Sequence, residues 1–442
     1  MTDTALLRRP DFRLFAGAQL LGSTGVWMLR MAMDWLVLEL TDSPAAVGVL
    51  VALQFLPMLV VGPLAGVLVD RHDRRRLVLA AQAASVLIAV VLAALTLGDV
   101  VLLWHVYALA TVLGVVGAID TPGRQVLVNE VVGDGRLRSA ISLTNAISQG
   151  GGLVGPAVAG FVIAEVGEGW SFGLNAVVGL CVVALLLAIR PHRLHVVPRL
   201  PRGPGQVREG FRYVAARSHL LAVVGLAGLM GAFGLNGPVV WTAFADGVWA
   251  TGAWGFGLYN SVAAVGAVAG ALLASRARSL RVRGVVLAAA LFGVAETVVA
   301  VMPTHATFLV AVAAVGVTTL LFLSSAITWV QLTADAHVRG RVLAIYSPVL
   351  LGGHALGGLV QGALVEHLGV RGGLVATGGL ALVSTGTVAA FLRRELRRRP
   401  AVPPSTPLAS TAHPAPSDLV PTPAHRPDST ARQPDSTTGG TP

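Results

Sequence analysis

The sequence predicts an all-α membrane protein with twelve transmembrane helices in two six-helix bundles and a disordered C-terminal tail. Its 442 residues are 54% hydrophobic and only 12% charged, with a mean hydropathy of +0.74. Soluble domains carry roughly 25% charged residues. Most of the long apolar runs hold about the 20 residues that a bilayer-spanning helix needs. The third observation is the placement of arginine in alternate loops, described below.

Twelve apolar segments can be distinguished, and helices are expected because backbone polar groups in lipid must bond within their own segment. The segments are 14–40, 45–69, 77–97, 101–119, 140–164, 170–190, 219–243, 252–275, 284–302, 306–330, 342–366 and 371–392. The resulting domains are an N-terminal bundle (1–190), a cytoplasmic linker (191–218), a C-terminal bundle (219–395) and a tail (396–442). Within the linker, residues 206–216 are expected to form a short amphipathic helix at the membrane surface.

Arginine indicates the orientation. The sequence contains no lysine, so all 32 basic residues are arginine. If the N-terminus lies inside, nearly all of them fall in cytoplasmic loops or ends; only Arg371 lies outside and only Arg30 lies within a segment. This distribution follows the positive-inside rule, so a multi-pass protein of a bacterial plasma membrane with both termini in the cytoplasm is expected. The net charge of +10 therefore records topology and argues against nucleic-acid binding.

Three ionisable residues within apolar segments are candidates for coupling to protons or substrate. Arg30 and Asp34 are four residues apart on the first segment and share one helix face. Charged groups at this depth usually face a cavity or a partner, so Asp34 is a candidate proton-exchanging carboxylate beside Arg30. The alternatives are a static ion pair or an Asp at the outer mouth. Glu296, on the ninth segment near its outer end, is a second candidate for coupling to protons or substrate.

A basic hairpin joins the second and third segments, where residues 62–77 read GPLAGVLVDRHDRRRL. Further acid–base clusters end the fourth segment and precede the eleventh. Salt bridges between the halves would hold the cytoplasmic side shut and break when it opens. The alternative is that these are solvated topology charges, each worth about 0–1 kcal/mol. This candidate cytoplasmic gate comprises Asp70, Arg71, Arg74, Arg75, Asp120, Arg124, Asp335, Arg339 and Arg341.

The fifth segment is unusually rich in small residues, reading NAISQGGGLVGPAVAG over 145–160. Glycine at this density lowers helix propensity but permits close helix approach, and proline adds a kink. Ordinary helix packing explains the pattern as well as a transport role does. The residues of this helix-packing motif are Gly151, Gly152, Gly155, Pro156 and Gly160.

These motifs resemble the major facilitator superfamily. Gly66, Asp70, Arg71, Arg74 and Arg75 match the signature loop between its second and third helices, although Asp73 stands where the general pattern has glycine. The stretches DTPGRQVLVNE, REGFRYV and VRGRVLAIY resemble the branch with macrolide-efflux and enterobactin-exporter-like proteins. The resemblance covers most of residues 10–395. It places the ninth helix at the periphery of the fold and associates the Gly-Pro fifth helix with antiport.

The resemblance implies a secondary transporter that exports small amphipathic molecules (drug, siderophore or metabolite) in exchange for protons by alternating access. A proton-coupled importer of a nutrient and a non-transporting membrane sensor or scaffold are the alternatives. No P-loop, metal-ligand spacing or nucleophile–base set is found, so no enzyme activity, metal or cofactor is expected. The expected partners are substrate, protons and lipid bilayer. A monomer is the default for this fold.

Overall fold

The computed structural model describes Leu6 and residues 9–133, 137–190, 206–276, 281–335 and 338–398. Residues 1–396 form one compact unit and residues 397–442 a second, and apart from the last two residues of α14 the helices below belong to the first. The linker residues 191–205 and the tail beyond Arg398 lie outside the described residues, as does the side chain of Asp70. All regular structure within the described residues is helical.

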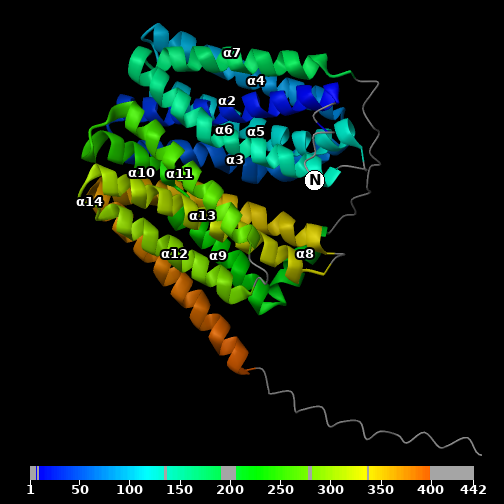
Figure 1. Ribbon diagram of the computed structural model, residues 1–442, viewed down its shortest axis with the longest axis vertical. Coiled ribbons are helices and arrows are strands. Elements are labelled where there is room, and N and C mark those ends of the chain that lie inside the picture. The colour runs from blue at the N-terminus through cyan, green and yellow to red at the C-terminus, as the bar shows by residue number, and fades with distance from the viewer. Residues whose placement is uncertain are drawn as a thin grey trace, which may run out of the picture. The chain divides into compact units, whose positions relative to one another are not determined.

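Figure 1 shows the arrangement of the helices. In chain order they are α2 (Pro10–Thr41), α3 (Pro44–Arg71), α4 (Arg74–Leu97), α5 (Leu103–Val132), α6 (Leu137–Val166), α7 (Glu168–Ala188), α8 (Gln206–Ala215), α9 (Ser218–Gly234), α10 (Gly237–Ala243), the π-helical turn η3 (Phe244–Val248), α11 (Gly252–Arg276), α12 (Val282–Ala300), α13 (His305–Thr333) and α14 (Arg339–Arg398).

Local sequence signals explain where several helices begin and end. The hydroxyl of Ser43 accepts a hydrogen bond from the Ala46 amide and caps α3, and Asp73 caps α4 through the Arg76 amide at 2.9 Å. Within α14, Gly369 has a φ of 72° and a ψ of 166°, so α14 consists of two helical stretches joined at this residue. Glycine permits this positive φ because it has no Cβ.

Ten segments of the described chain are long and apolar enough to cross a membrane. Helix α2 is not among them, because polar side chains such as Gln19, Arg30 and Asp34 lower its hydropathy. Residues 218–248 form one of these ten segments, although α9 ends at Gly234. Residues 339–395 form another, although α14 breaks at Gly369. The expected division into twelve spans therefore stays a prediction.

Helices that are close in sequence pack together, and a few contacts join the two halves of the chain. The N-terminal helices are α2–α7, and the C-terminal helices are α9–α14. Helix α2 packs against α6 and α7, α3 against α5, and α11 against α13. Between the halves, α6 packs against α11, and α10 contacts α2 and α3. The end of the helix unit where α2 turns into α3 is called the α2–α3 end, and the opposite end, where α3 turns into α4, the α3–α4 end.

Candidate functional site

One face of α2 lines two adjoining cavities. Its lining residues recur three or four positions apart, which is the spacing that places side chains on one helix face. They are Phe15, Gln19, Gly22, Ser23, Val26, Trp27, Arg30, Met31 and Asp34. At 1.5 Å per residue, this face extends roughly 28 Å along the helix. The cavity that includes Asp34 is called the central cavity, and the one that includes Gln19 is called the polar vestibule.

The central cavity has a volume of about 420 Å³ and is built by both halves of the chain. Its walls are mostly apolar or aromatic, with a small set of polar groups, which is typical of small-molecule sites. The polar, charged and tryptophan side chains that line it are Trp27, Arg30, Asp34, Gln54, Gln149, Trp241, Asn260, Glu296, Thr319 and His354. The cavity therefore brings together Arg30, Asp34 and Glu296, which lie on α2 and α12.

Asp34 is buried, with only 3% of its surface exposed. Its carboxylate accepts a hydrogen bond from the side-chain amide of Gln54 on α3, at 3.2 Å. The guanidinium of Arg30 lies 4.6 Å from the centroid of the Phe55 ring and 5.8 Å from that of Trp27, so it stacks on aromatic faces. Asp34 thus has a neutral amide as its hydrogen-bonding partner and a cation one turn away on its own helix.

Glu296 on α12 lines the same cavity and is 4% exposed. The side chains of Thr377 and Gln361 on α14 lie beside one side of its carboxyl group, and Oε2 has no hydrogen-bond partner among the described residues. Glu296 is thus part of the cavity wall, although the resemblance placed its helix at the periphery. His354 of α14 also lines the cavity and packs edge-on against Phe55, with ring centroids 4.3 Å apart.

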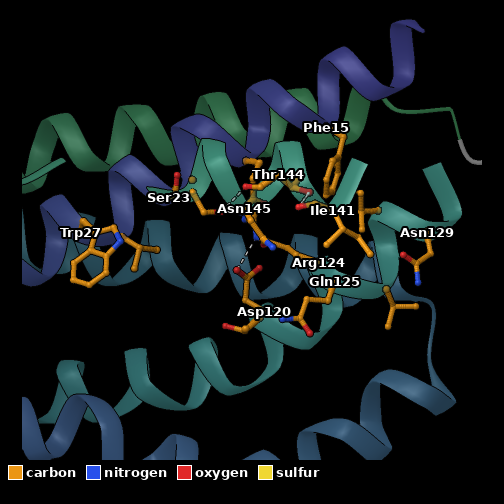
Figure 2. A pocket seen from close by; sticks show the side chains of 17 residues that line it. Phe15, Ser23, Trp27, Asp120, Arg124, Gln125, Asn129, Ile141, Thr144 and Asn145 are labelled. Atoms are coloured by element: carbon orange, nitrogen blue, oxygen red, sulfur yellow. Dashed lines mark hydrogen bonds and ion pairs between the residues drawn. The ribbon is translucent and has the colours of Figure 1, made fainter. Parts of the chain in front are cut away.

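The polar vestibule is a cavity of about 660 Å³ between α2, α5 and α6 (Figure 2). Trp27 lines both cavities, so the vestibule and the central cavity adjoin at this side chain. Figure 2 shows Asp120 and Arg124 of α5 opposite Ser23 of α2, with Asn145 of α6 beside them. A solute in the vestibule would meet amide, hydroxyl and charged groups before it reached the more apolar central cavity.

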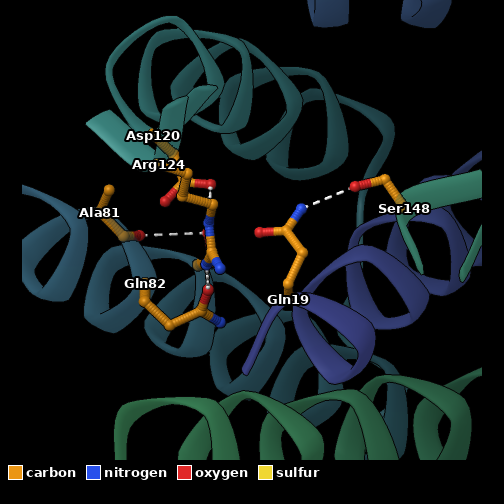
Figure 3. A network of polar contacts seen from close by, with 7 residues as sticks. Gln19, Ala81, Gln82, Asp120, Arg124 and Ser148 are labelled. Carbon is orange, nitrogen blue, oxygen red and sulfur yellow. Dashed lines mark hydrogen bonds and ion pairs between the residues drawn. The ribbon is translucent and has the colours of Figure 1, made fainter. Parts of the chain in front are cut away.

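A buried polar network holds the vestibule wall in place (Figure 3). The Nε of Arg124 donates to Asp120 at 2.7 Å, and its Nη2 donates to Gln82 of α4 at 2.8 Å. Across the cavity, Gln19 of α2 donates to Ser148 of α6 at 2.7 Å. The two hydrogen bonds of Arg124 fix the orientation of its guanidinium and link α4 with α5. The hydrogen bond from Gln19 to Ser148 links α2 with α6.

The two halves meet closely at the α2–α3 end. The carboxylate of Glu366 on α14 accepts hydrogen bonds from the Ser43 hydroxyl at 2.5 Å and from the Ala45 amide at 3.1 Å. A Cβ added to Gly48 of α3 would clash with the carbonyl oxygen of Gly358. A Cβ added to Gly362 would lie 2.9 Å from the Cα of Ala45. The central cavity is therefore covered at this end by direct contact of α3 with α14.

At the α3–α4 end, the ion pairs of the predicted gate residues differ from the contacts between the two halves at the α2–α3 end. The ion pairs that the structure gives for described residues here each lie within residues 74–130 or within residues 209–341. They are Arg74–Glu130, Arg124–Asp120, Arg217–Asp335 and Arg341–Glu209. Arg75 donates instead to the backbone carbonyls of Leu186 and Leu187, while Arg71 and Arg339 are exposed.

The glycines of α6 lie at helix contacts on two sides. A Cβ on Gly151 or Gly155 would clash with Thr24 or its neighbours on α2, and one on Gly152 would lie 3.3 Å from the Trp27 indole nitrogen. Gly160 faces the other half, where its added Cβ would lie 2.9 Å from the Cα of Gly257 on α11. The Pro156 carbonyl also faces Gly257. This helix therefore contacts both α2 and α11 through residues without side chains.

Several site residues are not evident from sequence reasoning. Trp27 separates the two cavities, Gln82 orients Arg124, and Glu366 joins α14 to α3. The spacing of Gln19, Ser23 and Trp27 from Arg30 and Asp34 is a local signal that predicts one lining face. No local signal pairs Gln82 with Arg124 or Glu366 with Ser43, because these contacts join different helices. Among the described residues, no group of three or more His, Cys, Asp or Glu is placed to hold a metal ion.

The model of the family described as transmembrane secretion effector, a major facilitator superfamily group, matches residues 1–414. The chain belongs to this family. The protein is therefore a multi-pass membrane transporter of small molecules and not an enzyme.

Named relatives of this secretion effector match it over nearly their full length. The multidrug efflux pump Tap of Mycolicibacterium fortuitum is 28% identical over 418 residues, covering 89% of this chain and 98% of the relative. The enterobactin exporter EntS of Salmonella choleraesuis (strain SC-B67) is 26% identical over 409 residues, covering 91% and 97%. These similarities extend across both halves of the transporter.

Solved structures support the fold. The nucleoside transporter NupG matches with a TM-score of 0.68 and 11% identity, covering 86% of this chain and 99% of that one. A bacterial homologue of the human lysosomal transporter Spinster, solved in an inward-facing and unoccupied conformation, matches with a TM-score of 0.68 and 15% identity, covering 88% and 98%. At these identities the likeness shows that the secretion effector shares their fold.

Proposed function

We propose that this transporter exports small amphipathic molecules in exchange for protons, by alternating access of a central cavity. The observation that carries the proposal is the continuous face of α2, which leads from the polar vestibule to the buried carboxyl group of Asp34. The mostly apolar walls of the central cavity suit a hydrophobic body, and the few polar groups suit a polar head. The relatives named as a multidrug efflux pump and an enterobactin exporter favour export over import.

The proposed topology has twelve spans in two six-helix bundles, 1–190 and 219–395, with a cytoplasmic linker at 191–218 and a C-terminal tail at 396–442. Helix α2 supplies the span with low hydropathy, and the two stretches of α14 on either side of Gly369 supply the last two. Arginine is concentrated at the α3–α4 end, so we assign this end and both termini to the cytoplasm. The protein is proposed to work as a monomer.

In this topology the structure represents a state closed to the outside. The closed α2–α3 end is the outer side, where α3 contacts α14 and α6 contacts α11. The ion pairs given at the cytoplasmic end stay within one half, which fits an inner side that has opened. The predicted gate residues would form pairs between the halves when the inner side closes.

Asp34 and the substrate are proposed to exclude each other. With the inner side open, substrate enters through the vestibule and occupies the central cavity beside an ionised Asp34. After the outer side opens, a proton from outside neutralises Asp34 and the substrate leaves. The protonated carboxyl group can then return through the closed state, and the proton is released to the cytoplasm. Glu296 is the second candidate for this proton, because it lines the same cavity.

The test is substrate-induced proton movement in inverted membrane vesicles with an acidified interior. Macrolides, dyes and ferric chelators serve as probe compounds, and a pH-sensitive fluorophore reports the gradient. A compound should collapse the gradient with the native protein but not with Asp34→Asn. Asp42→Asn is the matched control, because Asp42 is an exposed acid just after the same helix, and it should behave like the native protein.

The other possible results of this test would contradict parts of the proposal. If Asp34→Asn responds like the native protein, Asp34 is not the proton site and Glu296→Gln is tested next. If accumulation of a compound proceeds without any proton movement, proton coupling is wrong. If compounds leave the inverted vesicles along with protons, the protein is an importer.

A further inference from the structure

A third cavity lies between α12 and the last part of α14, apart from the two cavities of the transport site. Its volume is about 520 Å³. None of its residues lines the central cavity or the vestibule. The lining consists of Val282, Arg283, Val286, Leu287, Ala290, Ala389, Leu392 and Arg393. Apart from the two arginines, every one of these side chains is aliphatic.

The two arginines lie at the same end of the cavity's helices. Arg283 is in the first turn of α12, and Arg393 lies near the end of α14. Both side chains are exposed, and neither forms an ion pair or hydrogen bond with another described residue. Among the described residues, no acidic side chain lines the cavity. The site therefore presents two uncompensated guanidinium groups at one end of an aliphatic surface.

A diacyl phospholipid matches this arrangement, because it carries a charged phosphate at one end and aliphatic chains at the other. Guanidinium groups bind phosphate through forked, charge-assisted hydrogen bonds. An acyl chain in the cavity would make van der Waals contacts with its aliphatic walls, and Leu287 of this cavity is 60% exposed. Basic pockets between transmembrane helices on the cytoplasmic side are known to accommodate anionic headgroups.

We propose that this cavity binds an anionic phospholipid of the cytoplasmic leaflet. Its phosphate lies between Arg283 and Arg393, and an acyl chain covers Leu287, Ala290 and Leu392. The lipid bridges α12, which carries Glu296, and the end of α14. The leaflet follows from the orientation given under the proposed function, but lipid binding itself does not depend on the direction or coupling of transport.

The test measures lipid retention by the full-length protein in a neutral detergent, using native mass spectrometry. Phosphatidylglycerol and phosphatidylcholine with the same acyl chains are the two probes. The native protein should retain phosphatidylglycerol at least fivefold better than phosphatidylcholine. The double variant Arg283→Gln/Arg393→Gln should lose this preference. Equal retention of both lipids by the native protein would overturn the proposal.

A matched control separates this site from general surface charge. Arg281 and Arg394 are exposed neighbours of the two arginines and do not line the cavity. Arg281→Gln/Arg394→Gln removes the same charge and should change phosphatidylglycerol retention less than twofold. If both double variants lose retention equally, lipid binds to the basic surface at large and the cavity is not the site.

A second variant tests the aliphatic part of the cavity while keeping both arginines. Ala290→Phe fills the space that the acyl chain would occupy, and it should reduce phosphatidylglycerol retention at least fivefold. Glycerol phosphate and inorganic phosphate should not displace the lipid at equal concentration. Displacement by either would show that the site binds free phosphate and would overturn the lipid assignment. The vesicle transport assay scores the proposed function separately, so failure of one proposal does not appear as failure of the other.

Discussion

Glu366 of α14 accepts a hydrogen bond from the hydroxyl of Ser43, 2.5 Å away, and so joins the two halves at the α2–α3 end. The same carboxylate also accepts a hydrogen bond from the Ala45 amide in the first turn of α3. Hydrogen bonds to an ionised acceptor are roughly twice as strong as neutral ones. In the proposed topology, this carboxylate helps to keep the outer side closed.

Glu366→Gln should make the outer side open more often, because the amide lacks the negative charge that strengthens both hydrogen bonds. The reporter is Val51→Cys in a Cys181→Ala background, since Val51 is 1% exposed in the closed state. Its reaction rate with a membrane-impermeant charged thiol reagent should rise severalfold. The control Glu165→Gln removes an exposed acid of α6 near the same end and should leave the rate unchanged. An unchanged rate in Glu366→Gln would contradict the closing role.

Gly48→Val should prevent closure of the outer side, because any Cβ at Gly48 clashes with the Gly358 carbonyl oxygen. Close approach of two helices requires small residues at such contacts. Transport in vesicles should fall at least tenfold although the protein still reaches the membrane. Gly62→Val on the same helix is the control, because no heavy atom lies within 4 Å of a Cβ there. Comparable losses in both variants would mean that β-branching within α3, rather than the contact, is responsible.

Gln54→Leu should reduce proton-driven transport about tenfold or more, because Asp34 loses the amide that hydrogen-bonds to it. A hydrogen bond to a charged group contributes about 1.5–3 kcal/mol, and 1.4 kcal/mol corresponds to tenfold in an equilibrium. The measurement is initial transport rate against substrate concentration in energised inverted vesicles. Gln149→Leu changes another amide of the central cavity that is not bonded to Asp34, and its effect should be smaller. If Gln149→Leu is the more damaging change, the Gln54–Asp34 bond is not important for coupling.

Trp27→Ala should weaken substrate binding without uncoupling the protein, because Trp27 forms part of the wall of both cavities. An aromatic side chain contributes a large apolar contact area. We expect KM to rise about five- to tenfold and the ratio of protons to substrate to stay constant. Trp170→Ala, at an exposed position of α7, is the matched control and should leave KM unchanged. A changed proton ratio with an unchanged KM would assign Trp27 to coupling instead of binding.

Arg124→Gln should destabilise the N-terminal helices, because it leaves the buried Gln82 and the half-buried Asp120 without their donor. Because Asp120 is partly exposed, the cost should lie below the roughly 3–5 kcal/mol of breaking a fully buried ion pair. Thermal unfolding of the purified protein in detergent should therefore begin at a clearly lower temperature. Arg71→Gln removes an exposed arginine and should leave the unfolding temperature unchanged. Equal unfolding temperatures for native protein and Arg124→Gln would show that the network adds no net stability.

The helices and the shared face of Arg30 and Asp34 were predictable from sequence, because both depend on residues close together in the chain. Most apolar segments correspond to helices within a few residues of the expected bounds. The break between α9 and α10 and the π-helical turn after α10 were not anticipated, since the apolar run continues through them. Composition predicts that a segment can span a membrane but does not predict its local irregularities.

The candidate site shows the limit of the same reasoning. Asp34 and Glu296 were each recognised as ionisable groups in apolar segments, but only the packing of α2 and α12 around one cavity relates them. The charged residues at the α3–α4 end are recognisable from the sequence, whereas the partners of several of them are not. Arg74 pairs with Glu130 and Arg341 with Glu209, and neither pairing follows from the charge pattern.

The sequence by itself determined that the chain is a helical membrane protein, and its arginines predict which side of the bilayer each loop faces. These properties follow from hydropathy and charge, which act on each segment separately. Only the tertiary structure decided that Gln54 faces Asp34, that Trp27 lies between two cavities and that Glu366 reaches Ser43. Such contacts join residues on different helices, so they depend on how the helix surfaces fit together in space and leave no local periodic signal in the chain.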